Sequence, residues 1–565
     1  MSGAFRAAEP SSKYIVQREA PLIRGLNLLT MAPDGVAELR SLTRSLAVRG
    51  LMVNQETRDQ STSEVLATMR VERARLVQIG LAKPAKDPVL VHVAEQPYAL
   101  PTNWRWVRLA DVCSLVTDGE HATPQRCKDA TAIPLVTAKN VRSERMDYAR
   151  TDFVPRDVAA KCWLRCKPER GDILMVSVGA TLGRLCVIRE PVDMVLVRSV
   201  TLLRPLQVGV CADYLALHLM SSVSQREIWS EVKQSAQPGL YLAKTAALKI
   251  ALPPLAEQHR IVARVDELMK LCDALAQSGR LADAQHARLT STLFDALAAS
   301  ESAHALAENW QRIAAHLDLL LDRPEAIDAL EQTILQLAVR GLLVPQVASD
   351  RPTRIATLKP KVAEAPYEVP LGWAWRTVES IATVGSGTTP SRTNAKYFDP
   401  PEVPWVTSGE TGQPFIAVTA QAVSGLALRE TTLKVYPIGA LIVAMYGQGK
   451  TRGQIAELLL PATTNQACAA IVPTDPAVHH RRYIKLFFEK SYDELRSESV
   501  GGAQPNLNVG KIKSTLIPLP PLAEQHRIVA RVEELRRLCA QLRERLTEAR
   551  RTQSQLADAL VAKVD

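Results

Sequence analysis

The chain has 565 residues, which at roughly 150 residues per domain predicts three or four folding units. Hydrophobic residues make up 47% of it and charged residues 23%, an ordinary globular composition that excludes wholesale disorder and a fibrous fold. Lys and Arg number 69 against 59 Asp and Glu, and the resulting net charge of +10 is compatible with a polyanionic partner without establishing one.

The nine cysteines are dispersed along the chain. The one close pair, Cys162 and Cys166, has no second Cys or His pair at the spacing of a zinc site, so we expect no structural metal. The first residues lack the charged-then-apolar order of a signal peptide, and no apolar run reaches the ~18–20 residues of a membrane span. We therefore expect a chain of the reducing cytoplasm.

Residues 1–95 are predicted to form an N-terminal helical arm. Within it, LAVRGLMVNQ at residues 46–55 returns as LAVRGLLVPQ at residues 337–346. Residues 63–80 form a further helical stretch, which we expect to pack against the C-terminal helix. The arm would thereby complete a second copy of what residues 255–345 form continuously, in a circular arrangement.

Residues 96–254 are predicted to form a first mixed α/β domain. It starts at PYALPTNWRW, which is similar to PYEVPLGWAW at residues 366–375, and contains the β-type runs IPLVTAKNV and GDILMVSVG. Polar loops at residues 118–126 and 138–142 carry Gln, Asn, Arg, Lys and Thr side chains, which are groups that read base edges and phosphates. The alternative is that these loops are simply solvated.

Residues 255–345 are predicted to form a central helical region whose beginning is duplicated. LPPLAEQHRIVARVDEL at residues 252–268 differs from LPPLAEQHRIVARVEEL at residues 519–535 at one of 17 positions. Glu257 and Glu524 fall in the first turn after Pro-Pro, where a carboxylate suits the helix dipole. This block therefore indicates architecture or subunit contact and not catalysis.

A heptad of apolar or small residues continues from each duplicated block and predicts two long helices paired as a coiled coil. A helix over residues 261–296 would be roughly 54 Å long. The polar seam residues His286 and Gln553 are predicted to fix the register. The seam positions are Ile261, Val265, Leu268, Cys272, Leu275, Gly279, Ala282, His286, Leu289, Leu293 and Ala296 in the first copy, and Ile528, Val532, Leu535, Cys539, Leu542, Leu546, Ala549, Gln553, Leu556 and Leu560 in the second.

A linker over residues 346–366 leads to a second mixed α/β domain at residues 367–520, which is followed by a C-terminal helix at residues 521–565. GALIVAMYG and CAAIVP are its β-type runs. Its polar loops are residues 385–392, 407–413 and 446–454.

Two motifs of the second domain suggest enzymes, but the residues of each depart from the pattern that the chemistry requires. AMYGQGKT at residues 444–451 fits a loose P-loop pattern, but Ala444 replaces the leading Gly and Arg452-Gly453 stand where a helix should begin. FDPPE at residues 398–402 is similar to the Asp-Pro-Pro-aromatic loop of amino-methyltransferases, but Glu402 replaces the aromatic residue. No catalytic triad, metal cluster or paired carboxylate stands out either, so we expect no catalytic residues.

Several of these segments together resemble the specificity subunits of Type I restriction-modification systems. They are the two LPPLAEQHRIVARV blocks, the Pro-x-x-Trp-x-Trp segment of each domain, LAVRGLLVPQ, and YGQGKTRGQ with TTNQAC. The resemblance covers the chain from about residue 20 to its end. It implies an α+β fold with a pseudo-two-fold internal repeat, in which two target recognition domains are separated by two long conserved helices packed as an antiparallel coiled coil.

The resemblance further implies a noncatalytic DNA-binding subunit, each domain of which reads one half of a bipartite, asymmetric site in double-stranded DNA. Two different domains predict two different half-sites, because a symmetric reader would need identical ones. It also implies assembly with two modification subunits, which bind S-adenosylmethionine and methylate adenine, and with restriction subunits that use ATP and Mg. This chain itself would bind no cofactor.

The candidate DNA contacts lie in the polar loops. Among them, Lys and Arg are expected to contact phosphates, and Gln, Asn and Thr to read bases. They are His121, Thr123, Gln125, Arg126, Lys139, Asn140, Gln237 and Tyr241 in the first domain, and Thr389, Ser391, Arg392, Gln448, Lys450, Arg452, Gln504, Asn506 and Asn508 in the second.

Two other functions stay open at this point. An ATP-dependent enzyme would use residues 444–451, and nucleotide binding that is lost in Lys450→Ala would support it. A coiled-coil scaffold without DNA binding would assemble with its partners independently of salt. It would also show no DNA affinity at low salt, whereas phosphate contacts make DNA binding steeply salt-dependent.

Overall fold

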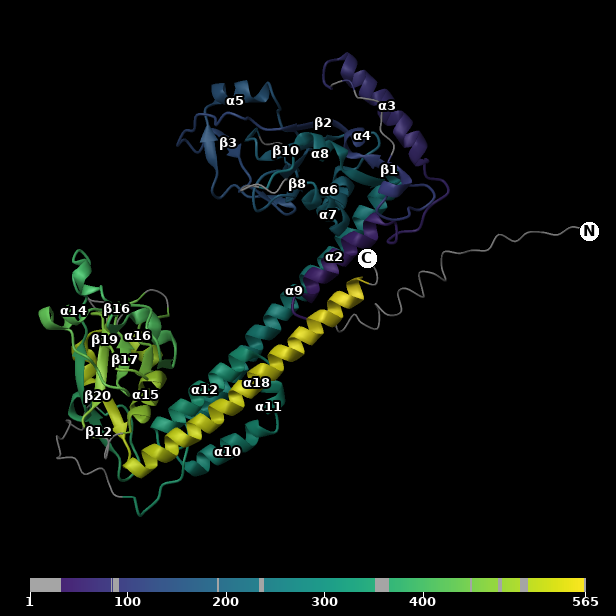
Figure 1. Cartoon of the computed structure of the whole chain (residues 1–565). Coiled ribbons are helices and arrows are strands. Elements are labelled where there is room, and N and C mark those ends of the chain that lie inside the picture. Colours follow the sequence, from purple (N-terminus) through teal and green to yellow (C-terminus); the bar gives the residue numbers. More distant parts are fainter. Residues whose placement is uncertain are drawn as a thin grey trace, which may run out of the picture. The chain divides into compact units, whose positions relative to one another are not determined.

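A computed structural model describes residues 32–82, 84, 91–190, 193–232, 238–350, 365–447, 450–475, 480–497 and 507–562. The chain divides into two compact units, whose elements are labelled in Figure 1. The first unit consists of Met1–Arg280 and Arg550–Asp565, and the second of Leu281–Ala549. Two long helices contribute to both units, because the unit boundaries fall inside α9 (Leu255–Ala298) and α18 (Leu522–Ala562).

The first unit contains a mixed domain made of small sheets. Its first strand, β1 (Arg105–Arg108), pairs antiparallel with its last, β11 (Lys249–Leu252). The central antiparallel sheet has the order β2 (Cys113–Asp118), β10 (Val200–Pro205), β7 (Ile173–Val176) and β8 (Leu185–Val187). A further sheet places β3 (Ile133–Val136) between β6 (Asp152–Val154) and β9 (Val195–Leu196), and β3 runs parallel to β9. A short hairpin joins β4 (Val141–Arg142) to β5 (Arg145–Met146).

Short helices cover these sheets. They are α4 (Leu109–Val112), α5 (Arg156–Trp163), α6 (Ala212–Met220), α7 (Ser222–Ser230) and α8 (Leu242–Ala247). All four residues of β7 are buried, which is typical of a strand covered on both faces. The run GDILMVSVG is therefore a core strand followed by a loop.

The second unit contains a second mixed domain. Its first strand, β12 (Ala374–Thr377), pairs with its last, β21 (Leu516–Leu519). The central sheet has the order β13 (Ala382–Ser386), β20 (Cys468–Pro473), β17 (Leu441–Ala444), β18 (Ile455–Leu458) and β15 (Phe415–Ile416). The other sheet has the order β16 (Ala422–Val423), β14 (Val403–Val406) and β19 (Thr463–Thr464). The helices are α13 (Val378–Ile381), α14 (Gly425–Glu430), α15 (Arg481–Lys490), α16 (Tyr492–Ser497) and α17 (Val509–Ser514).

The two domains follow the same strand plan. The order β2-β10-β7-β8 corresponds to β13-β20-β17-β18, and the parallel pair β3 and β9 corresponds to β14 and β19. The sequence prediction of two mixed domains combined with long helices is confirmed. Because the plan survives where the sequences differ, strand burial and pairing fix the fold, and the loops are left free to vary.

The duplicated block anchors each long helix to its domain. Gln258 is fully buried; its Oε1 accepts the backbone N–H of Cys211 at 2.8 Å, and its Nε2 donates to Gly209 O at 2.9 Å. In the second copy Gln525 Oε1 accepts the backbone N–H of His480 at 2.8 Å. Cys211 and His480 are the residues that precede α6 and α15. The block is therefore architectural, as its sequence indicates.

The buried glutamates of the two copies have different hydrogen-bond partners. Glu524 accepts hydrogen bonds from Trp373 Nε1 at 2.9 Å and from Gln346 Nε2 at 2.6 Å. In the first copy Gln55, the counterpart of Gln346, is exposed, and Glu257 Oε1 makes no hydrogen bond within the residues that the structure describes. Burial raises the pKa of Glu257 to about 7, against the opposing effects of the Trp104 indole and of Arg260. Burial raises the pKa of Glu524 as well, so the two copies differ in the hydrogen bonds of the carboxyl and not in the direction of its pKa.

We predict that Glu257→Gln flattens the pH dependence of stability. Since the folded pKa is about 7 and the unfolded value is 4.5, protonation of Glu257 stabilises the fold at low pH, and this contribution is lost as the pH rises through 7. The melting temperature of the variant relative to the parent chain should therefore rise between pH 5 and pH 8.

Scanning calorimetry of the full chain at both pH values measures this difference. Glu524→Gln is the comparison variant, and it should be destabilised at both pH values because Trp373 and Gln346 donate to different carboxylate oxygens, one of which the amide replaces with an NH2 donor. Parallel pH profiles for Glu257→Gln and the parent chain would contradict the prediction.

A buried histidine of the first copy is replaced in the second copy, together with the residue to which it is hydrogen-bonded. Tyr214 Oη donates to Ala251 O at 2.7 Å, and Tyr483 Oη donates to Pro518 O at 2.6 Å, so the two sites correspond. His218, one helical turn after Tyr214, accepts the Ala251 backbone N–H on Nε2 at 3.0 Å, and burial lowers its pKa to about 3. Pro518 has no N–H, and the position that corresponds to His218 is Phe487. An acceptor is present only where there is a donor to satisfy.

We predict a favourable coupling energy between His218 and Ala251. His218→Phe leaves the buried Ala251 N–H without an acceptor and should cost about 1–3 kcal/mol of unfolding free energy. Ala251→Pro leaves His218 Nε2 without a donor and should also destabilise. The double variant, which reproduces the second copy at both positions, should cost less than the sum of the two single changes. Urea denaturation of all four proteins measures the cycle, and additive costs would exclude this compensation.

The long helices bury a stripe that differs in part from the predicted heptad. The first seam positions are buried in both copies, including Ile261 and Cys272 in α9 and Ile528 and Cys539 in α18. Farther along, Leu289 is 53% exposed while Thr290, one residue later, is 3% exposed. The second copy shows the same shift, from an exposed Leu556 to a buried Ala557.

The shift follows from helix geometry. An α-helix with 3.6 residues per turn drifts by about 20° per heptad from a 3.5-residue repeat, which amounts to nearly one residue over four heptads. The buried stripe of each helix therefore follows the straight-helix period. The prediction that His286 fixes a coiled-coil register is also wrong, because its Nε2 lies 3.1 Å from Leu319 O and 3.3 Å from Asp322 Oδ1 in the segment around α11.

Shorter helices supply the partners of α9 and α18. In the first unit, α2 (Gly35–Val48) places Ala47 against the start of α9 and Leu42 against Ala557 and Val561 at the end of α18. In the second unit, α12 (Pro324–Val339) packs on the first half of α18, and Arg543 in the middle of α18 pairs with Asp328 at 2.6 Å. The end of α9 packs there against α10 (Ala303–Ala314) and α11 (Leu317–Leu320).

The helical stretch predicted at residues 63–80 is α3 (Thr62–Gln78), which begins at a capping box of Ser61 and Glu64. We expected it to contact the C-terminal helix, but its buried residues Val65 and Met69 belong to the core of the first domain. In the first unit α2 makes the contact with the end of α18 instead. The short apolar stripe of α3 fits the domain surface beside Gly209, where a side chain would clash with Met69.

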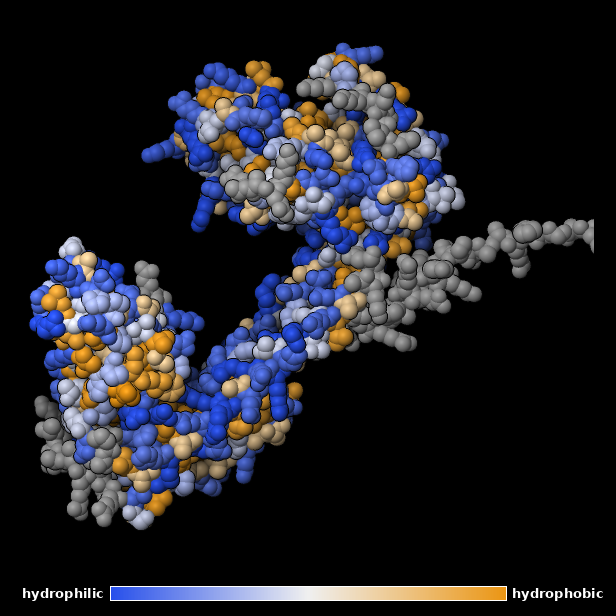
Figure 2. All heavy atoms as spheres, in the orientation of Figure 1, coloured by the Kyte–Doolittle hydropathy of each residue, from blue (hydrophilic) through white to orange (hydrophobic). Residues whose placement is uncertain are grey.

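The visible surface of the long helices is mostly hydrophilic, with separate apolar side chains (Figure 2). None of the helices in the described parts of the chain is long and apolar enough to cross a membrane.

Candidate nucleic-acid interface

In each domain, a glycine directly after one strand lets the candidate loop pack closely against the parallel strand pair. A Cβ atom on Gly119, which follows β2, would lie 2.2 Å from the carbonyl carbon of Leu196 in β9. A Cβ atom on Gly387, which follows β13, would lie 1.9 Å from the carbonyl oxygen of Thr464 in β19. Only glycine permits this approach, so the loop that follows β2 or β13 starts against the parallel strand pair in both domains.

Three loops of the first domain converge at this point. The backbone N–H of Glu120 donates to Leu196 O at 2.8 Å and that of Arg198 to Glu120 O at 2.9 Å, which joins the loops after β2 and β9. The N–H of Ser177 donates to Ser199 O, and the N–H of Leu240 to Ser177 O, both at 2.9 Å, which adds the loop after β7 and the segment before α8.

A cavity of about 450 Å³ lies where these loops meet. Its polar lining contains an acid, two bases and several hydroxyl groups. Thr201 is fully buried, and its Oγ1 makes no hydrogen bond with any described residue. The polar side chains around the cavity are Asp118, His121, Ser177, Arg198, Thr201 and Tyr241.

Asp118 organises the charges at the edge of this cavity. His121 Nε2 lies 2.8 Å from Asp118 Oδ2, and the Arg165 guanidinium contacts both Asp118 Oδ1 and, at 3.0 Å, His121 Nε2. Burial opposes ionisation of Asp118, but the hydrogen bonds from Arg165 and His121 outweigh it and lower the pKa of this carboxyl. An ionised carboxylate therefore holds His121 at the cavity.

Most of the predicted contacts of the first domain lie on this surface or on the adjoining loop. His121 and Tyr241 line the cavity, and Thr123 and Gln125 are exposed on the loop after β2. Arg126 pairs with Asp152 at 2.9 Å. Lys139 is exposed, and Gln237 lies outside the described residues.

Asn140 does not fit the prediction that it contacts DNA. Its side chain is 2% exposed; Oδ1 accepts from Thr137 N at 2.9 Å, and Nδ2 donates to Asp147 O at 3.0 Å and Thr151 Oγ1 at 2.9 Å. In the second domain Glu410 takes the same place, accepting from Thr407 N at 2.6 Å. Asn140 therefore holds its loop, and its amide has no group left to read a base.

We predict that Asn140→Ala lowers the stability of the fold and that Lys139→Ala does not. Asn140→Ala removes several buried hydrogen bonds and should cost about 1–3 kcal/mol of unfolding free energy. Lys139→Ala, at the neighbouring exposed position, should leave the melting temperature within about 1–2 °C of the parent and weaken DNA binding if Lys139 contacts a phosphate. Thermal melting and a DNA titration of both variants test this, and a full-stability Asn140→Ala protein would overturn the structural role.

The predicted contacts of the second domain occupy three separate loops. Thr389, Ser391 and Arg392 follow β13, and Ser391 Oγ lies 2.8 Å from Thr393 Oγ1. Lys450 is exposed and Arg452 half-buried in the loop after β17. Asn508 caps α17, accepting the Lys511 N–H at 2.9 Å. Three further candidates lie outside the described residues: Gln448, Gln504 and Asn506.

The structure shows what the P-loop-like segment and the FDPPE segment do in the fold. Residues 450–454 form turns, and β18 begins at Ile455, so no helix follows Lys450 and Thr451 as a P-loop requires. Glu402 Oε2 accepts the backbone N–H of Gly425 at 2.5 Å, at the start of α14. Both segments therefore shape the second domain.

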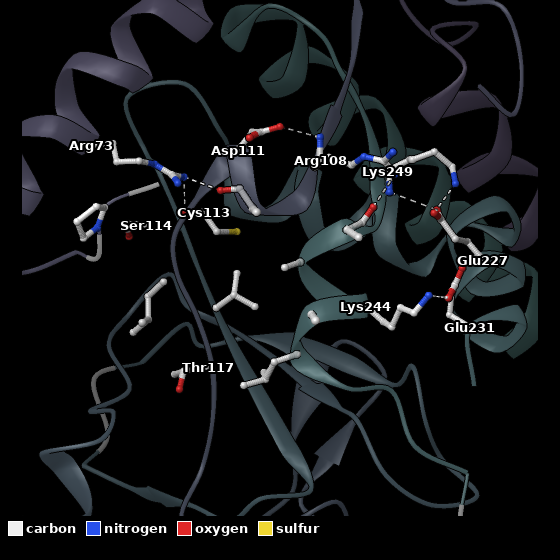
Figure 3. A pocket seen from close by; sticks show the side chains of 18 of the residues that line it. Arg73, Arg108, Asp111, Cys113, Ser114, Thr117, Glu227, Glu231, Lys244 and Lys249 are labelled. Carbon is white, nitrogen blue, oxygen red and sulfur yellow. Dashed lines mark hydrogen bonds and ion pairs between the residues drawn. The ribbon is translucent and has the colours of Figure 1, made fainter. Parts of the chain in front are cut away.

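A larger cavity, about 1070 Å³, lies elsewhere in the first domain, beside β2, α4 and α8 (Figure 3). Its charged groups are paired with one another: Lys249 with Glu227 at 2.6 Å, and Lys244 with Glu231 at 2.7 Å. Arg73 donates to Ala110 O at 2.6 Å. These pairs tie α3, α4, α7 and α8 together, which is a structural arrangement.

Sequence reasoning missed Asp118 and Arg198, which line the cavity, and Arg165, which contacts Asp118. Arg165 comes from the turn after α5 and reaches Asp118 across 47 positions of sequence, which no local pattern can predict. Arg198 gave no signal either, because residues 195–200, VLVRSV, share no residue with TTNQAC, and only the strand register shows that Arg198 corresponds to Gln466. Among the described residues, no group of three or more His, Cys, Asp and Glu side chains could hold a metal ion.

Comparisons with known proteins agree with this arrangement of two domains. A family model described as "Type I restriction modification DNA specificity domain" matches residues 101–285 and 370–549. The specificity subunits of the Type I restriction enzymes EcoEI and EcoAI from Escherichia coli are 27% and 28% identical to the chain, and each alignment covers 93% of both proteins. A chain from a solved type I R-M system is 18% identical with a TM-score of 0.46, and the match covers 83% of this chain and 99% of that one.

Proposed function

The chain belongs to the family of Type I restriction modification DNA specificity domains, and from this membership we propose that it gives a restriction-modification complex its DNA sequence specificity. The observation that carries the proposal is the duplicated domain: one strand plan presents two different sets of polar loops. Each domain would read one half of a bipartite site. Because the loops differ, the halves would differ too, and the site would be asymmetric.

The long helices support a fixed distance between the two half-sites. Helix α9 has 44 residues and would span roughly 66 Å, which corresponds to about 19 base pairs at 3.4 Å each. We propose that α9 and α18 separate the recognition domains as an antiparallel pair, with α2 and α12 as supporting helices. This length is an upper limit for the distance between half-site centres.

We further propose that the catalytic steps belong to other subunits. Two modification subunits would bind S-adenosylmethionine and methylate adenine, and restriction subunits would use ATP and Mg. The anchoring contacts of Gln258 and Gln525 support a scaffolding role, because they hold each long helix rigidly on its domain. The chain would bind DNA mainly through the loops around Gly119 and Gly387, with its excess of positive charge contributing to phosphate contact.

Exchange of one domain tests the proposal. The full chain is expressed with its modification partner, and methylated adenines are mapped across a genome by single-molecule sequencing. The parent should methylate one split, asymmetric motif. A variant in which residues 366–519 are replaced by residues 97–252 should methylate a symmetric motif made of two inverted copies of one half, because the flanking segments are nearly identical.

Two results would contradict the proposal. A contiguous motif, or an asymmetric motif that is unchanged in the variant, would exclude one domain per half-site. If no methylation is found, a titration of the purified chain on DNA at 50 and 200 mM salt decides whether it binds DNA at all, since specific and nonspecific binding both weaken steeply with salt.

A further inference from the structure

One position is equivalent in the two domains and carries a different long polar side chain in each. Strands β9 and β19 both run parallel to the preceding strand, with the registers Val136 to Leu196 and Val406 to Thr464. Residues 197–199 then lead to β10, and residues 465–467 lead to β20. The last residue of each segment accepts an equivalent backbone hydrogen bond: Ser199 O from Ser177 N in the first domain, and Ala467 O from Met445 N in the second. Arg198 therefore corresponds to Gln466.

Both side chains are presented on a fixed backbone. The backbone N–H of Arg198 donates to Glu120 O at 2.9 Å, and Asn465, beside Gln466, donates to Val406 O at 2.9 Å. Arg198 and Gln466 are exposed, and neither side chain makes a hydrogen bond or ion pair with another residue in the described part of the chain. By contrast, the nearby Arg165 is bound to Asp118. Rigid backbones with unengaged side chains are what a reading position needs.

The surroundings of Arg198 indicate a ligand rich in hydrogen-bonding groups. Arg198 lines the 450 Å³ cavity together with Thr201, whose fully buried hydroxyl has no partner among the described residues. A buried hydroxyl without a partner costs free energy unless a ligand or water supplies one. His121 and Tyr241 add further polar groups at the same cavity. A base edge carries donors and acceptors of this kind, whereas a phosphate only accepts.

We infer that Arg198 and Gln466 read one base each, Arg198 a guanine in the half-site of the first domain and Gln466 an adenine in the half-site of the second. The guanidinium donates two hydrogen bonds to O6 and N7 of guanine, and the glutamine amide accepts from N6 and donates to N7 of adenine. This inference rests on the proposed function, because it names the specificity-determining residues of the same site.

Reciprocal substitutions test the inference in the full chain with its modification partner. Arg198→Gln should change or relax one guanine position of the first half-site and leave the second half-site unaltered. Gln466→Arg should do the same to one adenine position of the second half-site only. On oligonucleotides that carry each of the four bases at that position, the preference of the parent for guanine should fall by about 10- to 100-fold in Arg198→Gln.

Arg170→Gln is the control, because Arg170 is exposed three residues before β7 begins, whereas Ser177 and the cavity lie after the end of that strand. It removes the same charge and should leave the preference at every position unchanged. Thermal melting of all three variants checks that the exposed substitutions leave the fold intact.

Each other outcome overturns the inference. A first half-site without guanine, or an unchanged preference in Arg198→Gln, excludes base reading by this residue. Uniformly weaker binding with all four bases, with a salt slope reduced by about one, would assign Arg198 to a phosphate instead. These failures leave the parent with its bipartite motif, whereas failure of the proposed function removes that motif from the parent itself.

Discussion

The buried glutamine in the first turn of each long helix is the interaction on which the rest of the structure depends. Gln258 and Gln525 are both fully buried and each accepts the backbone N–H that precedes a domain helix. Removing such a group would leave part-buried backbone donors unpaired, which costs free energy. The arginine two residues later adds an ion pair, from Arg260 to Asp59 at 2.6 Å and from Arg527 to Asp350 at 2.7 Å. A helix held in this way has one direction relative to its domain.

A rigid junction leaves the loops at the other end of the domain free to differ. The same strand plan carries HATPQR after Gly119 and TTPSR after Gly387, and it carries Arg198 where the other copy has Gln466. Coupled differences also occur in the core, where the histidine acceptor of Ala251 is absent beside Pro518. The copies have thus diverged freely in their loops, and in the core a hydrogen-bond acceptor is absent where its donor is absent.

The sequence predicts some residues of the candidate interface correctly and misses others. The loops after β2 and β13 could be identified from their polar composition, and His121 and Tyr241 do lie at one cavity. Asn140 looked equally suitable, but its burial and its hydrogen bonds depend on Asp147 and Thr151, which only the folded loop brings within reach. Arg198 was missed because its role depends on the register of a parallel strand pair, and two short strands give no sequence signal for pairing.

The sequence by itself determined the duplication, the presence of two mixed domains, the start of each long helix and the family, because these follow from near-identical segments and from residue periodicity. The tertiary structure alone decided which loops meet, where α3 packs, and how the buried stripe of α9 shifts from Leu289 to Thr290. The physical reason is the same in each case. Local sequence sets propensity and pattern, whereas burial and hydrogen-bond partners are properties of residues that lie far apart in the chain and become neighbours only on folding.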